Sequence, residues 1–164
     1  MSATVIDAFE FARLNEHREG QLAVADLPRL AKESSDTSSK LQWALTGGFG
    51  RLGHPQLKLL VSASVQPICQ RCLTSFPLNI ASESVLVLAK DEADADRIEE
   101  MLDEDEAEVI VGSKEMSILV LIEDEALLAL PLSPRHEVCP DASLLESKIG
   151  GKPSPFAVLR DIKK

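Results

Sequence analysis

The sequence has no tyrosine, one tryptophan and five phenylalanines in 164 residues. Proteins that bind single-stranded nucleic acid commonly stack the bases on aromatic side chains, so a stacking surface is not expected here. Positive charge is also scarce, because 17 Lys and Arg residues stand against 27 Asp and Glu residues and give a formal net charge of −10. Broad phosphate contact draws on clustered Lys and Arg. Any contact with RNA should therefore be local, whereas a basic protein partner would be attracted.

Long apolar runs are missing as well. The run from Ile118 to Ile122 ends at the acidic triplet Glu123, Asp124 and Glu125, whereas a helix that crosses a bilayer needs about 20 apolar residues. The N-terminal stretch MSATVIDAFEFARLNEH contains acids and lacks both the basic start and the continuous apolar segment of a secretory signal. We therefore expect a cytoplasmic protein that does not enter a membrane.

The pattern of apolar residues predicts one α+β domain over residues 1–164. We expect a short helix within 1–19, a strand and turn at 21–32, and a loop at 33–40. Alternating residues predict strands at 41–46, 56–65 and 76–89, with Gly47 and Gly48 as a bend and a further strand at 109–111. The sheet should be an antiparallel meander, open or barrel-like, covered by one main helix at 118–130 that Ser117 caps. Residues 90–108 form an acidic stretch, expected as a solvated loop or frayed helix, and 140–164 a Pro- and Gly-containing arm.

Two short motifs could hold a metal ion together. Cys69 and Cys72 form a C-x-x-C pair between two predicted strands, and His136 and Cys139 form an H-x-x-C pair just beyond the main helix. Three cysteines and one histidine are a known ligand set for structural zinc. The alternative is that the cysteines pack as small apolar residues and that His136 lies on the surface. A redox role is disfavoured, because the residues after Cys72 do not have the helical pattern that follows a thioredoxin-like motif.

The acidic triplet is the other set of candidate functional residues. Consecutive residues on a helix point about 100° apart, so Glu123, Asp124 and Glu125 cannot converge on one substrate. Glu125 interrupts the apolar stripe of its helix and would need a buried partner, for which Arg71 is the candidate. No nucleophile and base motif, phosphate-binding loop or metalloprotease motif is present. We therefore predict neither an enzyme nor a small-molecule substrate.

Three segments together resemble the YceD family of large ribosomal RNA subunit accumulation proteins: ICQRCLTSF at 68–76, LIEDEALLALPLSPRHEVC at 121–139 and PSPFAVL at 153–159. The order and the spacing of the segments match as well. The positions that match the shared pattern are Cys69, Arg71, Cys72, Glu123, Asp124, Glu125, Pro131, Pro134 and Phe156. The resemblance implies a role in the accumulation of large-subunit ribosomal RNA and carries no catalytic residues.

From these observations we expect a factor for ribosome biogenesis that supports synthesis, processing or stability of 23S ribosomal RNA by binding. Its partner would be this RNA or a pre-ribosomal particle, contacted directly or through basic ribosomal proteins. The alternatives are an adaptor that binds only basic ribosomal proteins, or a C-x-x-C redox protein. The residues expected in binding are Arg71, Glu123, Asp124, Glu125, Pro134 and Phe156, and those expected at a metal are Cys69, Cys72, His136 and Cys139.

Overall fold

The computed structural model describes residues 4–102 and 107–140, while residues 1–3, 103–106 and 141–164 lie outside the described part. Its main feature is a sheet of five strands in the order β2-β3-β4-β5-β6. These strands are β2 (His17–Ala23), β3 (Lys40–Phe49), β4 (Pro55–Val65), β5 (Leu78–Ala89) and β6 (Glu108–Val111). Each of the first four strands is antiparallel to its neighbours among them, and β6 runs parallel to β5. The α+β class is confirmed, and the sheet is open, with β2 and β6 at its edges.

The alternation along β4 shows why the sheet has one buried face. Leu57, Leu59, Val61, Ala63 and Val65 are buried, whereas the residues between them are exposed. Successive side chains of a strand point to opposite faces, so a period of two places every apolar residue on one side. The core of the protein lies on that side.

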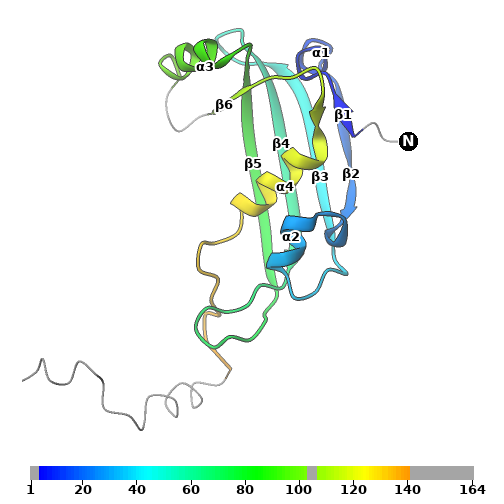
Figure 1. Ribbon diagram of the computed structural model, residues 1–164, viewed down its shortest axis with the longest axis vertical. Helices are drawn as coiled ribbons and strands as arrows, with labels where there is room; N and C mark the ends of the chain where they lie inside the picture. Colours follow the sequence, from blue (N-terminus) through cyan, green and yellow to red (C-terminus); the bar gives the residue numbers. More distant parts are fainter. Residues whose placement is uncertain (1–3, 103–106, 141–164) are drawn as a thin grey trace, which may run out of the picture.

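Three helices cover the buried face (Figure 1): α1 (Ala8–Arg13), α2 (Pro28–Glu33) and α4 (Ile118–Leu128). The Ser117 hydroxyl accepts a hydrogen bond from the Val120 amide at 3.4 Å, so Ser117 caps α4 as predicted. Helix α4 buries Ile118, Ile122 and Ala126 against the sheet. The short strand β1 (Val5–Ile6) pairs with β7 (Met116–Ser117) and holds the N-terminal segment beside the start of α4.

The N-terminal third differs from the sequence-based expectation. The strand and turn predicted at 21–32 are correct only in part, because β2 begins at His17 and ends at Ala23, and the 3-10 turn that follows, η1 (Val24–Asp26), leads into helix α2. The predicted bend at Gly47 is wrong, because β3 continues through it. A Cβ atom on Gly47 would lie 2.4 Å from the carbonyl oxygen of Phe11, so the glycine lets α1 approach the strand rather than turning the chain.

The acidic stretch at 90–108, expected as a solvated loop or frayed helix, contains a helix that packs on the sheet. Helix α3 (Glu92–Glu99) forms within it and buries Ala95 and Ile98 against Val87 and Ala89 of β5. The Asp91 side chain accepts a hydrogen bond from the Asp94 amide and caps the helix. Two apolar side chains on one face were enough to attach the helix, while its many carboxylates point into solvent.

Candidate functional site

Two loops at one end of the sheet lie against each other. We call residues 66–77, between β4 and β5, the cysteine loop and residues 129–140, after α4, the proline loop; together they form the knuckle (Figure 1). The Gln70 amide donates to the Pro134 carbonyl at 2.9 Å, and the Arg71 guanidinium donates to the His136 carbonyl at 2.7 Å. These bonds join segments more than 60 residues apart in sequence.

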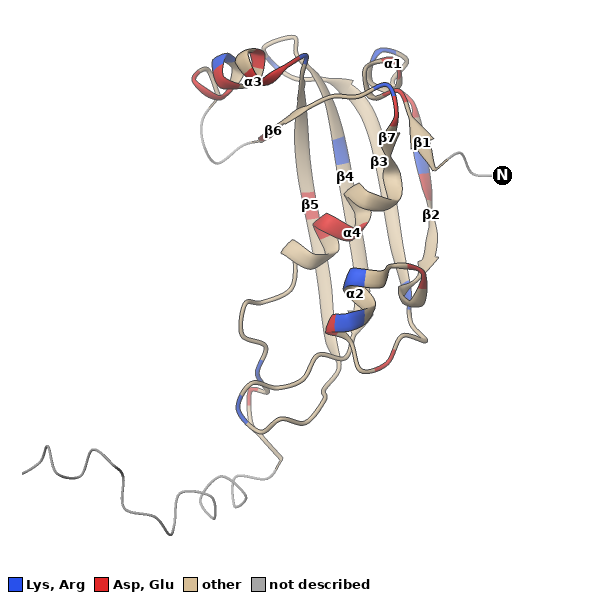
Figure 2. Ribbon diagram, viewed as in Figure 1, with Lys and Arg blue, Asp and Glu red and all other residues tan. Residues whose placement is uncertain are grey.

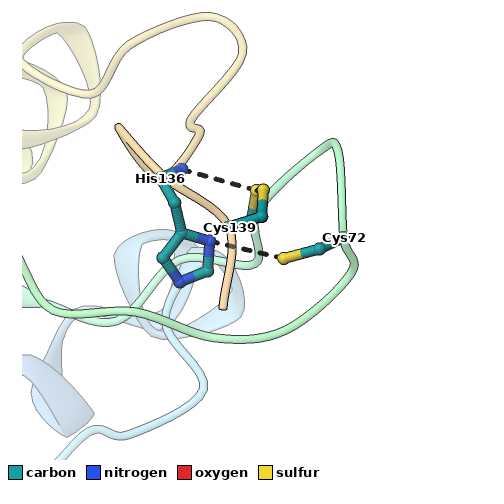
Figure 3. A group of neighbouring side chains, drawn as sticks. Cys72, His136 and Cys139 are labelled. Atoms are coloured by element: carbon teal, nitrogen blue, oxygen red, sulfur yellow. Dashed lines mark hydrogen bonds between the residues drawn. The ribbon is translucent and has the colours of Figure 1, made fainter. Parts of the chain in front are cut away.

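The knuckle brings Cys69, Cys72, His136 and Cys139 together, and Figure 3 labels the last three of them. Their ligand atoms all lie within 4.8 Å of one another. The two sulfurs of Cys69 and Cys139 are 3.9 Å apart, and the Cys72 sulfur is 3.3 Å from Nδ1 of His136. Each loop contributes two of the four side chains. The sequence prediction that the two motifs meet is therefore confirmed.

The spacing of the four ligand atoms suits a tetrahedral ion. With Zn–S at about 2.3 Å and Zn–N at about 2.1 Å, tetrahedral angles place two ligand sulfurs about 3.8 Å apart and a sulfur and a nitrogen about 3.6 Å apart. The two separations given above lie within a few tenths of an ångström of these values. The residues present therefore fit a zinc ion in their chemistry, and these two separations are compatible with tetrahedral coordination.

Backbone amides lower the pKa of the Cys69 thiol. Burial by itself would raise the pKa of this thiol, but the amides of Cys72, His136 and Arg71 point at its sulfur and lower the pKa to about 5. The bonds from Arg71 and His136 are both 3.4 Å long. Cys139 behaves in the opposite way, because burial and the neighbouring thiols raise its pKa. A bound metal ion would favour the deprotonated form of the thiols that coordinate it.

The turn after Cys72 places a leucine in an unfavourable conformation. Leu73 has a φ of 61°, in the left-handed region, and its amide donates to the Cys69 carbonyl at 2.9 Å. This conformation costs a residue with a side chain about 1 kcal/mol. Its side chain is 69% exposed, so burial does not explain the position. The tight return of the chain around Cys69 and Cys72 accounts for it.

The predicted pair of Arg71 with Glu125 is wrong. Glu125 is buried and accepts a very short hydrogen bond from the Ser82 hydroxyl of β5. Arg71 is exposed and spans the knuckle instead. The serine lies on the same face of the sheet as α4, so Glu125 ties this helix to the strand beneath it.

The first two residues of the acidic triplet contact α2. The buried Glu123 carboxylate accepts from the amides of Arg29 and Leu30, at 2.6 and 3.2 Å, and from Nε of Arg29 at 2.9 Å. Burial raises the pKa of Glu123, but these donors outweigh it and hold the pKa below its usual value. Asp124, which is half exposed, forms an ion pair with Nη1 of Arg29 at 2.6 Å. The triplet thus fastens α4 to both α2 and the sheet.

Of the remaining predicted binding residues, Pro134 lies in the proline loop, and Phe156 lies outside the described residues. Sequence reasoning missed Arg29 and Ser82 as partners of the triplet, because nothing in their local pattern points to contacts 94 and 43 residues away. No described helix is long and apolar enough to cross a membrane.

The fold and the four-ligand cluster define a small α+β protein whose candidate site joins two loops. Residues 57–163 match the family model of the large ribosomal RNA subunit accumulation protein YceD. A curated Haemophilus influenzae protein with the same name is 27% identical over 167 residues, covering 97% of this chain and 94% of the relative. No solved structure matches. The chain belongs to the YceD family.

Proposed function

We propose that the chain is a cytoplasmic factor that supports the accumulation of large-subunit ribosomal RNA by binding and without catalysis. The observation that carries the proposal is membership of a family described by that role, over 107 consecutive residues. The geometry supports a binding role, because the described residues that could hold a metal ion form a group of four protein ligands. The step affected would be synthesis, processing or stability of the RNA.

The cluster supports a structural zinc ion held by Cys69, Cys72, His136 and Cys139. Four protein ligands complete a tetrahedron and leave no position for water, which is typical of structural and not of catalytic zinc. Each loop supplies two ligands, so the ion would cross-link the knuckle. Arg71 would support it from outside, because its charge faces the thiolates and its guanidinium holds the carbonyl of His136.

We further propose that the knuckle contacts the pre-ribosomal particle. Leu73, Leu132 and Val138 are 69, 107 and 84% exposed, and such apolar side chains in one region are frequent at protein contacts. Arg71 would supply the positive charge, Pro134 the shape of the proline loop, and Phe156 a further apolar contact. The acidic triplet would support this surface indirectly. Glu123 and Glu125 are buried and hold α4 in place, and the proline loop begins at the end of this helix.

The metal is tested by elemental analysis of protein purified without chelator. We expect one zinc per chain in the natural protein and none in Cys139→Ser, while Ser133→Ala, a matched change in the same loop, retains the metal. If protein purified in this way contains no zinc, and its three thiols react without denaturant, the zinc site is refuted. Rapid alkylation of Cys69 in such protein would favour the redox alternative.

The role in ribosomal RNA is tested by depleting the protein and measuring 23S relative to 16S ribosomal RNA. A selective fall in 23S that the natural chain restores is expected, and an unchanged ratio would refute the function. Arg71→Glu should restore 23S poorly while remaining folded. If Arg71→Glu restores 23S fully, Arg71 is not part of the contact surface.

A further inference from the structure

The sheet has a second face that the described helices leave mostly uncovered. Gln42 and Ala44 of β3, and Leu60 and Ser62 of β4, alternate with core residues and so point away from α4. On β5, Ser82 binds α4, so its neighbours Ala81 and Glu83 also point to this second face. A hollow of about 720 Å³ lies on it. We call this surface the open face.

The strand register shows how the hollow is built. Glu19 pairs with Ala44, Ala44 with Leu60, and Leu60 with Glu83, so these four side chains form one row across β2, β3, β4 and β5. Neighbouring strands lie about 4.8 Å apart, so the backbone positions of the two acids are about 14 Å from each other across an apolar floor. An α-helix with its side chains is about 10–12 Å wide. The row has the width to accept one helix between its carboxylates.

The charge around the hollow is negative. Glu19 and Glu83 are its only charged lining residues among those described. Helix α3 packs on the same face through Val87 and Ala89, and residues 91–100 carry six carboxylates against Arg97 (Figure 2). Two nearby basic side chains contact these acids: Nζ of Lys58 lies 2.5 Å from Glu83, and Nε2 of His17 lies 3.5 Å from Glu19.

Those two pairs do not block a partner. All four side chains are between 45 and 75% exposed, and exposed ion pairs contribute little, so an incoming cation can replace either one. Leu60 is 38% exposed in the middle of the row and offers an apolar contact between the two acids. The arrangement complements an amphipathic helix that carries Lys or Arg on both sides of an apolar stripe.

We propose that the open face docks a basic amphipathic helix of a partner protein. The proposal rests on the proposed function, in which the partner belongs to the pre-ribosomal particle, and it assigns that contact to protein rather than RNA. Phosphates would be repelled by the carboxylates of the row and of α3. The aromatic residue among those lining the hollow, Trp43, packs against the core and so offers no ring on this face on which a base could stack. The knuckle remains a separate surface at the end of the sheet.

The first test is site-specific photo-crosslinking in cells. A benzophenone amino acid replaces Leu60 on the open face or, as a control of similar size and exposure, Leu52 in the β3–β4 turn, which is 55% exposed. We expect position 60, and not 52, to crosslink to a Lys- and Arg-rich segment of another protein. Crosslinks from position 60 to RNA, to a second copy of this chain, to this chain's own residues or to nothing would each overturn the proposal.

The second test uses a defined probe, a synthetic 20-residue helical peptide of leucine and lysine, at 150 mM salt. Glu19→Gln with Glu83→Gln should weaken its binding at least tenfold. Glu99→Gln with Glu100→Gln, which changes the net charge equally, should weaken it less than threefold, because screening limits distant charges. Equal losses in both double variants would show nonspecific attraction and overturn the docking site.

The two proposals fail in different ways. The open-face double variant should keep the natural zinc content and melting temperature, because Glu19 and Glu83 are exposed and pair with His17 and Lys58, which lie outside the knuckle. An unchanged 23S ratio after depletion would refute the ribosomal role while leaving the peptide and crosslinking results intact. If 23S levels are natural but no crosslink forms from position 60, the proposed docking role of the open face is refuted.

Discussion

Replacing Glu123 by glutamine should destabilise the fold strongly although the shape of the side chain is kept. The glutamine oxygen can still accept from the amides of Arg29 and Leu30, but as a neutral group, and its amide nitrogen would face Nε of Arg29. A hydrogen bond to a charged group contributes about 1 kcal/mol more than a neutral one, and three bonds are affected. We therefore expect a loss of about 3 kcal/mol in the free energy of unfolding.

The matched control is Asp124→Asn, the adjacent carboxylate on the same arginine. Asp124 is 48% exposed, and exposed ion pairs contribute about 0–1 kcal/mol. Urea denaturation followed by circular dichroism measures both variants under the same conditions. Equal losses in the two variants, or a loss below about 1 kcal/mol for Glu123→Gln, would refute the reasoning from burial.

The same carboxylate makes a prediction about pH. Because the folded protein holds the pKa of Glu123 below its ordinary value, the unfolded chain binds more protons between the two pKa values. The stabilisation by Glu123 is therefore complete above the unfolded value of about 4.3 and is lost as the pH falls through the folded pKa. The difference in stability between the natural protein and Glu123→Gln should shrink at low pH. A difference that stays constant down to pH 2 would contradict this.

Three further substitutions test packing. Gly47→Ala should cost at least about 2 kcal/mol, because its Cβ would overlap a carbonyl oxygen of α1, whereas Gly48→Ala meets only an ordinary contact at 3.6 Å; equal melting temperatures would contradict this. Ser82→Ala removes the donor to the buried carboxylate of α4 and should cost about 2 kcal/mol, while Ser84→Ala removes a buried hydroxyl without a partner and should be neutral or stabilising by denaturation. Leu73→Gly relieves a positive φ and should stabilise by up to about 1 kcal/mol; a lower melting temperature would argue against strain there.

The sequence by itself determined the elements whose periodicity is regular. Alternating residues in 56–65 and 76–89 predicted β4 and β5, and the apolar stripe after Ser117 predicted α4. The predicted and observed ends of these elements agree to within two residues. The two cysteine motifs predicted a shared cluster, because ligand chemistry limits which residues can meet at one ion. These signals are local, since each can be read from spacing within one segment.

Only the tertiary structure decided which segments meet. The bonds of Glu123 to Arg29 and of Glu125 to Ser82 join positions far apart in the chain, and no local pattern encodes them. Two consecutive glycines such as Gly47 and Gly48 are typical of a bend, yet Gly47 lies within β3 and allows α1 to approach the strand closely. The row of Glu19, Ala44, Leu60 and Glu83 exists only once four strands have paired in register. Local periodicity fixes the type and the buried face of an element, but pairing and packing over long separations decide its neighbours and therefore its sites.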